Sequence, residues 1–122
     1  MSDEQRRQAV RVKLRLMVFM KCVGARKVLR VLTKNISGVG MLLVTEGTLE
    51  PETKLELEIT LPDRKMPILC EARVVWSKPT GEPHKSYAAP PSETGVKFVS
   101  IDPKDQAQLL QYARLNAFQD AP

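Results

Sequence analysis

The chain has 122 residues, of which 43% are apolar and 27% are charged, so it can bury one hydrophobic core and lacks the composition of a disordered protein. Its net charge of +5 favours an anionic partner such as a nucleotide, a nucleic acid or a lipid headgroup. Its two cysteines lie far apart and form no Cys-x-x-Cys pair, which argues against a metal site and for reduced, buried thiols.

The N-terminal end of the chain is basic and contains no apolar signal core. We expect Met1–Arg11 to form a flexible segment ahead of a folded domain at residues 12–118. The longest apolar stretch, Leu14–Val23, is interrupted by Arg15 and Lys21 and is too short to span a bilayer. We therefore expect a cytoplasmic protein without a membrane span.

Alternating apolar and polar residues predict three strands in the first half of the chain. The first runs over Val12–Cys22, and the second, Lys27–Thr33, follows a turn at Gly24 and pairs with it as a hairpin. Turn residues at 35–40 separate the second strand from a third at Met41–Val44. Strands with this pattern bury one face against a core.

The second half of the chain predicts three more strands. Lys54–Leu61 alternates leucine or isoleucine with polar residues almost without error, and Ile68–Trp76 continues the pattern. Lys78–Thr94 is rich in proline and small polar residues, so we expect a long mobile loop there. A last strand follows at Gly95–Val99.

A terminal helix completes the predicted domain. Asp102 is placed to cap it, with Pro103 in the first turn. Leu109, Leu110, Ala113 and Ala117 recur on one face at helical spacing, so we expect this face to pack on the sheet. Six short antiparallel strands leave two open edges unless the sheet closes. We predict an all-β fold, a six-stranded antiparallel β-barrel with a C-terminal α-helix over one opening.

Two short motifs carry the chemistry that the sequence offers. Arg7 and Arg11 lie four residues apart, and both are long enough to converge on one anion with their forked donors, although such a pair also suits a solvated basic tail. The turn Asn35–Gly40 offers an amide, a hydroxyl and two glycines. It can contact a ligand or simply reverse the chain. Neither motif decides between these roles alone.

The order of these motifs along the chain, together with two later segments, is more specific. The four segments are Arg7-x-x-x-Arg11, Asn35-x-Ser37-x-x-Gly40, Ala72-Arg-Val-Val-Trp76 and Gly95-Val-Lys-Phe98. They resemble the PilZ domain family, whose signature is an RxxxR motif and a [D/N]xSxxG motif on a six-stranded barrel. Both motifs match without a substitution, and the resemblance spans nearly the whole chain.

The resemblance implies a bacterial receptor for the second messenger cyclic di-GMP and not an enzyme. Arg7 and Arg11 would hold one guanine edge and the phosphodiester, because arginine forks match both groups. Asn35 and Ser37 would bond the other guanine, and Gly40 would let the ligand lie close to the backbone. The single histidine lies in the predicted loop, with no neighbouring constellation that suggests catalysis.

Two more residues extend the implied site. Arg6 directly precedes the arginine pair, and in this family an arginine there is associated with an intercalated dimer of the ligand. Trp76 occupies a position where the family often has an aromatic residue beside the ligand, and an indole stacks on a purine with ~1–3 kcal/mol. By alternation Trp76 belongs equally well to the core. We expect no metal and no cofactor apart from cyclic di-GMP.

The implied function is a ligand-responsive adaptor. Binding would order the arginine segment across the barrel mouth, and a partner protein in motility, pilus function or exopolysaccharide synthesis would detect the change. One alternative is a PilZ-fold interaction scaffold without ligand binding, although such members usually lack a motif that is intact here. Another is a basic nucleic-acid-binding barrel. Such barrels usually stack bases on several aromatic side chains, whereas this chain has only six Phe, Trp and Tyr residues, scattered along the sequence.

Overall fold

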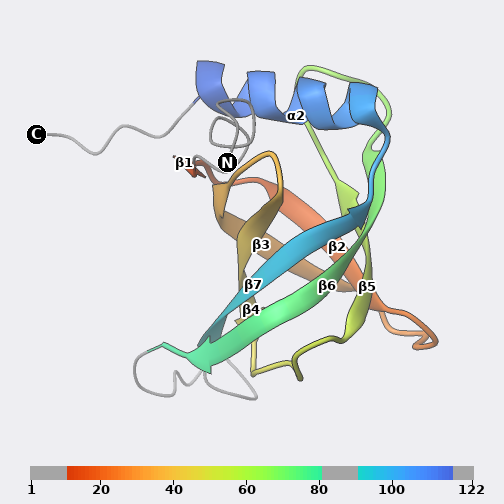
Figure 1. The fold of residues 1–122 in the computed structure, drawn as a ribbon, viewed down its shortest axis with the longest axis vertical. Coiled ribbons are helices and arrows are strands. Elements are labelled where there is room, and N and C mark those ends of the chain that lie inside the picture. Colours follow the sequence, from red (N-terminus) through yellow and green to blue (C-terminus); the bar gives the residue numbers. More distant parts are fainter. Residues whose placement is uncertain (1–10, 81–90, 117–122) are drawn as a thin grey trace, which may run out of the picture.

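The structure, a computed structural model, describes residues 11–80 and 91–116 and is shown in Figure 1. Within these ranges it contains seven strands and one helix. They are β1 (Val12–Lys13), β2 (Met17–Cys22), β3 (Leu29–Ile36), β4 (Gly40–Glu46), β5 (Lys54–Ile59), β6 (Ile68–Pro79), β7 (Pro91–Ser100) and α2 (Pro103–Leu115).

Six of the strands close into an antiparallel barrel. Hydrogen-bonded neighbours follow the order β3-β2-β5-β6-β7-β4, and β4 pairs back with β3. The short β1 adds two residues to β3 beside this ring. Closure leaves no open edge among these six strands, and α2 lies across one end of the barrel (Figure 1). The predicted six-stranded antiparallel barrel with a C-terminal helix is confirmed.

The interior of the barrel holds the hydrophobic core. On β5, Leu55, Leu57 and Ile59 alternate with polar residues and are at most 2% exposed. Leu109 and Ala113 bring the apolar face of α2 into the same cluster. The period-2 pattern of the strands and the helical spacing therefore point at one common core.

Polar contacts fix both the start and the position of α2. Asp102 caps the helix by accepting a hydrogen bond from the backbone nitrogen of Lys104 at 2.8 Å, as predicted. Arg64, between β5 and β6, donates to Asp105 at 3.0 Å and to Gln108 at 2.7 Å. These bonds tie the helix to the rim that it covers. No helix of the described residues is long and apolar enough to cross a membrane.

The first predicted strand, Val12–Cys22, is wrong in one respect, because the structure divides it into β1 and β2. Between them the hydroxyl of Thr33 donates to the backbone oxygen of Leu14 at 2.6 Å and accepts from the backbone nitrogen of Leu16 at 2.7 Å. A side chain of β3 thus replaces regular strand pairing at this point.

The predicted loop Lys78–Thr94 is shorter than expected. Strand β6 continues to Pro79 and β7 begins at Pro91, while residues 81–90 lie outside the described part of the chain. Thr94 is fully buried, and its hydroxyl bonds those of Ser77 at 2.8 Å and Thr45 at 2.9 Å. This internal hydroxyl network lets polar residues that resemble a loop sequence form paired strands.

Candidate ligand-binding site

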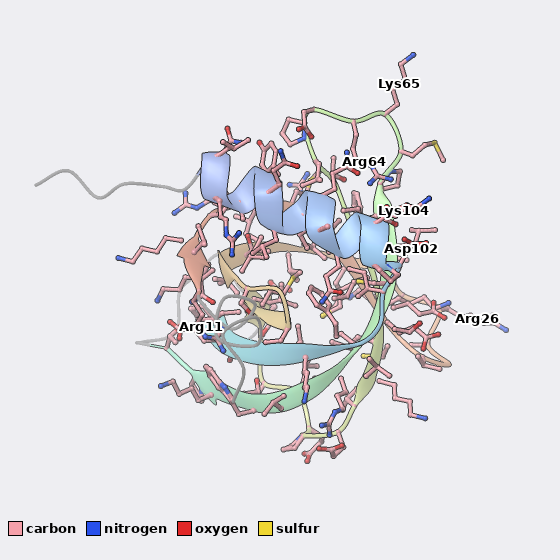
Figure 2. The ribbon with its side chains drawn as sticks, turned by 45° about the horizontal axis from the view of Figure 1, so that its top comes forward. Arg11, Arg26, Arg64, Lys65, Asp102 and Lys104 are labelled. Atoms are coloured by element: carbon pink, nitrogen blue, oxygen red, sulfur yellow. The ribbon has the colours of Figure 1, made fainter. Side chains whose placement is uncertain are left out.

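The two sequence motifs meet where β1 pairs with β3. Lys13 is the strand partner of Asn35, which brings the residues just before β1 alongside the end of β3. Arg11, labelled in Figure 2, donates a hydrogen bond from its guanidinium to Oδ1 of Asn35 at 2.7 Å. The other predicted arginines, Arg6 and Arg7, lie outside the described residues. One arginine and the asparagine are therefore in direct contact.

The turn that follows Asn35 is held by its own serine. The Ser37 backbone nitrogen donates to the backbone oxygen of Gly40 at 2.8 Å, and its hydroxyl accepts from the backbone nitrogen of Val39 at 3.2 Å. Ser37 is only 2% exposed. From α2, Gln106 donates to the backbone oxygen of Gly38. The hydroxyl thus shapes the turn, and the helix holds the turn in place.

Gly40 is required by packing as well as by any ligand. A Cβ atom at this position would lie 2.1 Å from the backbone oxygen of Val96 on the adjacent strand β7. Such a distance is far below van der Waals contact, so only glycine allows β4 and β7 to approach this closely. The last residue of the turn motif therefore also allows the close packing of the barrel wall.

Trp76 leaves the core because β6 is irregular. The register with β7 shifts between Val74 and Trp76, so Val74 is fully buried while Trp76 is 36% exposed and pairs with Gly95. A Cβ on Gly95 would lie 2.6 Å from Nε1 of Trp76, which shows that the indole lies directly on the glycine. Of the two roles left open for Trp76, core packing is thereby excluded.

These residues line one open cavity of about 240 Å³. Four predicted site residues form part of its wall, and Asn35 contacts one of them, Arg11, from the side. The lining residues are Arg11, Ser37, Val39, Gly40, Val75, Trp76, Gly95, Val96 and Lys97. Gly95 and Lys97 also line the cavity and were not among the site residues predicted from the sequence. A glycine inside a strand pattern is the signal of close approach that could have indicated Gly95.

The cavity is positively charged. Arg11 and Lys97 line it, and none of the described lining residues is acidic. Lys78 adds a third cation next to the cavity wall, with Nζ 5.4 Å from the ring centroid of Trp76. No group of three or more His, Cys, Asp or Glu side chains in the described ranges could hold a metal ion. The geometry therefore suits a planar, anionic ligand.

The family model of the PilZ domain matches residues 5–115 of the sequence. The chain belongs to the PilZ domain family. PilZ domains are receptor and adaptor domains, and the cavity described above combines cations with an aromatic surface. The match includes both arginine and turn motifs, so every predicted site residue lies within the family's domain.

Two solved structures resemble this PilZ domain. The inhibitor of motility MotI/DgrA from Bacillus subtilis superposes with a TM-score of 0.72 at 27% identity, over 91% of this chain and 51% of that one. The present chain thus spans about half the length of MotI/DgrA. The PilZ domain of YcgR from Escherichia coli, solved with c-di-GMP, has a TM-score of 0.69 at 14% identity and covers 91% of both chains. The curated proteins contain no match to the sequence.

Proposed function

We propose that this PilZ domain is a receptor for cyclic di-GMP that acts as an adaptor in a bacterial cytoplasm. The observation that carries the proposal is the hydrogen bond between Arg11 and Asn35, which joins the two motifs beside the cationic cavity. The YcgR domain of the same fold was solved with this ligand, which supports the assignment. The proposed ligand contacts are Arg6, Arg7, Arg11, Asn35, Ser37, Gly40 and Trp76.

The Arg11–Asn35 bond prepares the asparagine for a guanine. Arg11 occupies the amide oxygen of Asn35, so the amide nitrogen keeps its two donors for other partners. Guanine presents O6 and N7 as acceptors along one edge. The guanidinium of Arg11 retains further donors that can take a phosphate oxygen in a charge-assisted bond. One fixed pair can therefore address both the base and the phosphodiester of the ligand.

The indole of Trp76 supplies an apolar surface beside these donors. Its position on Gly95 fixes one side of the ring, and part of the indole stays exposed. A purine stacked on such a surface gains ~1–3 kcal/mol, and Lys97 lies in the same cavity to attract the phosphates. Arg6 and Arg7 would reach the remaining phosphates and the second molecule of an intercalated ligand dimer.

As an adaptor, the domain would report the ligand through its N-terminal segment. Binding would draw Arg6 and Arg7 over the mouth of the barrel beside α2 and change the surface that a partner protein meets. Motility, pilus function and exopolysaccharide synthesis are the settings we consider. Motility has the added support that MotI/DgrA, at 27% identity, is an inhibitor of motility.

Isothermal titration with cyclic di-GMP, with cyclic di-AMP as the control, tests the proposal. We expect saturable binding that is selective for the guanine compound, with close to two ligands per chain. Arg11→Ala should abolish detectable binding. Arg15→Ala is the matched control. Arg15 is exposed, and its substitution removes the same charge four residues away while leaving the turn motif unchanged.

Two outcomes would contradict this assignment. Absence of both heat and thermal stabilisation with either dinucleotide would leave a PilZ-fold scaffold that binds no ligand. Salt-dependent binding of arbitrary single-stranded oligonucleotides, with equal loss in the Arg11 and Arg15 variants, would instead favour a nucleic-acid-binding barrel.

A further inference from the structure

The outer wall of the barrel carries a second and larger cavity, of about 440 Å³, over β2, β5 and β6. It extends to Asp102 at the start of α2, whereas Arg11 of the candidate site lies on the opposite side of the view in Figure 2. Strand pairing arranges its side chains in two rows on the same outward face. The rows are Phe19, Glu58 and Leu69, and Lys21, Glu56 and Glu71.

Large apolar side chains gather at this cavity although they face outward. Leu69 is 65% exposed and Val28 is 55% exposed, and the partly exposed Phe19 lies in the same row as Leu69. Single exposed apolar residues are ordinary on protein surfaces. Three of them line this one cavity, and apolar side chains gathered at one place on a surface mark a site of interaction.

The rim of this cavity is acidic, in contrast to the chain as a whole. Glu56, Glu58, Glu71 and Asp102 line it, against the single cation Lys21. Lys21 lies 3.5 Å from Glu56. Neither Glu58 nor Glu71 forms a salt bridge with another described residue. Four carboxylates against one lysine give this surface a negative charge in a chain whose net charge is +5.

We propose that this acidic cavity is the docking site for a segment of a partner protein that carries lysine or arginine beside large apolar side chains. The apolar floor of Phe19, Val28 and Leu69 would bury the partner's apolar residues, and the carboxylates would pair with its cations. The acidic rim disfavours nucleic acid and anionic lipid surfaces. It also disfavours a symmetric dimer of this chain, because a two-fold axis would place carboxylates against carboxylates.

The docking site is tested on the full chain without cyclic di-GMP, so its outcome is separate from that of the proposed receptor function. The probe is a synthetic amphipathic peptide of leucine and lysine, and a peptide of leucine and glutamate with the same length and pattern is the control. Methyl NMR spectra of the protein are recorded during each titration. We expect saturable shifts at Val28 and Leu69 with the lysine peptide and none with the glutamate peptide.

Matched variants connect the binding to this surface. Leu69→Ala should weaken binding of the lysine peptide by about tenfold, as truncation of a central interface residue does. Leu32→Ala is the control, because Leu32 is 44% exposed on β3, outside this cavity. The double variant Glu58→Lys, Glu71→Lys should reverse the preference between the two peptides.

Three results would overturn the proposal. The first is equal binding of both peptides, and the second is a set of shifts that maps to another face of the barrel or is absent. The third is a concentration-dependent dimer in analytical ultracentrifugation that Leu69→Ala dissociates, because it would assign the same surface to a second copy of the chain.

Discussion

The hydroxyl of Thr33 supports the part of the chain that presents Arg11, and removing it gives a measurable test of the fold. Thr33 is 1% exposed and bonds the backbone oxygen of Leu14 at 2.6 Å and the backbone nitrogen of Leu16 at 2.7 Å. These two bonds hold the connection between β1 and β2 against β3. Thr33→Val keeps the shape of the side chain and removes both bonds.

The size of the effect follows from the groups that lose their partner. Leu14 and Leu16 are both buried, so the substitution leaves one backbone acceptor and one backbone donor without a replacement. Each buried group left unsatisfied costs ~1–3 kcal/mol. We therefore expect the free energy of unfolding to fall by roughly 2–6 kcal/mol, which at an m value of about 2 kcal/mol/M lowers the urea midpoint by roughly 1–3 M.

Urea unfolding followed by tryptophan fluorescence measures this loss directly, because Trp76 is the only tryptophan in the chain. Thr48→Val is the control, since Thr48 is exposed, and it should change the free energy of unfolding by less than ~0.5 kcal/mol. A Thr33→Val protein that is as stable as this control would refute the structural role assigned to the hydroxyl.

Other substitutions test the site and the core. Gly95→Ala places a Cβ 2.6 Å from the partly exposed indole of Trp76, so we expect the ring to swing out, with a red-shifted fluorescence and a stability loss below ~1 kcal/mol. Gly40→Ala places its Cβ 2.1 Å from a backbone oxygen of β7, so urea unfolding should show a larger loss of ~1–3 kcal/mol; equal losses would contradict this contrast. Burial raises the pKa of the Cys70 thiol from 9.0 to about 12, so a thiol reagent at pH 8 should label Cys22 and spare Cys70 in the native protein. Because the unfolded Cys70 thiol loses its proton near 9.0 and the folded one near 12, this thiol should lower the free energy of unfolding as pH rises from 9 towards 12; a Cys70→Ala variant with an undiminished decline would contradict it.

The strands that could be predicted are those whose burial follows a simple period. On β5 every second residue enters the core, so alternation alone locates the strand. The break between β1 and β2 could not be predicted in this way, because Leu14 and Leu16 keep the alternation and are both buried. The interruption comes from the side chain of Thr33, a residue 17 to 19 positions further along the chain.

The extent of β6 and β7 could not be predicted, because the residues concerned are typical of loops. Ser77 and Thr94 satisfy each other's hydroxyls inside the barrel wall, and Pro79 and Pro91 stand at strand ends, where a missing N–H is tolerated. Proline and small polar residues have a low propensity for strands, so propensity alone predicts a loop here. Pairing across the sheet outweighs that preference here.

At the candidate site, too, features set by neighbouring residues could be predicted from the sequence, and features set by distant strand pairing could not. Arg11, Asn35, Ser37 and Gly40 were identified because their motifs lie in short segments of sequence. The position of Trp76 could not be derived from alternation, because the register shift in β6 turns it out of the core. A shift of one residue moves a side chain to the other face of a sheet, and no residue within the segment indicates it.

The net charge of the chain hides an uneven distribution of charge over its surface. The total of +5 predicts an anionic partner, yet the charge is unevenly distributed, with Arg11 and Lys97 in one cavity and Glu58 and Glu71 in another. A nucleotide is attracted to the first surface and repelled by the second, and a basic protein segment behaves in the opposite way. On the functions proposed here, ligand and partner are therefore directed by charge to different faces of one small barrel and can be bound together.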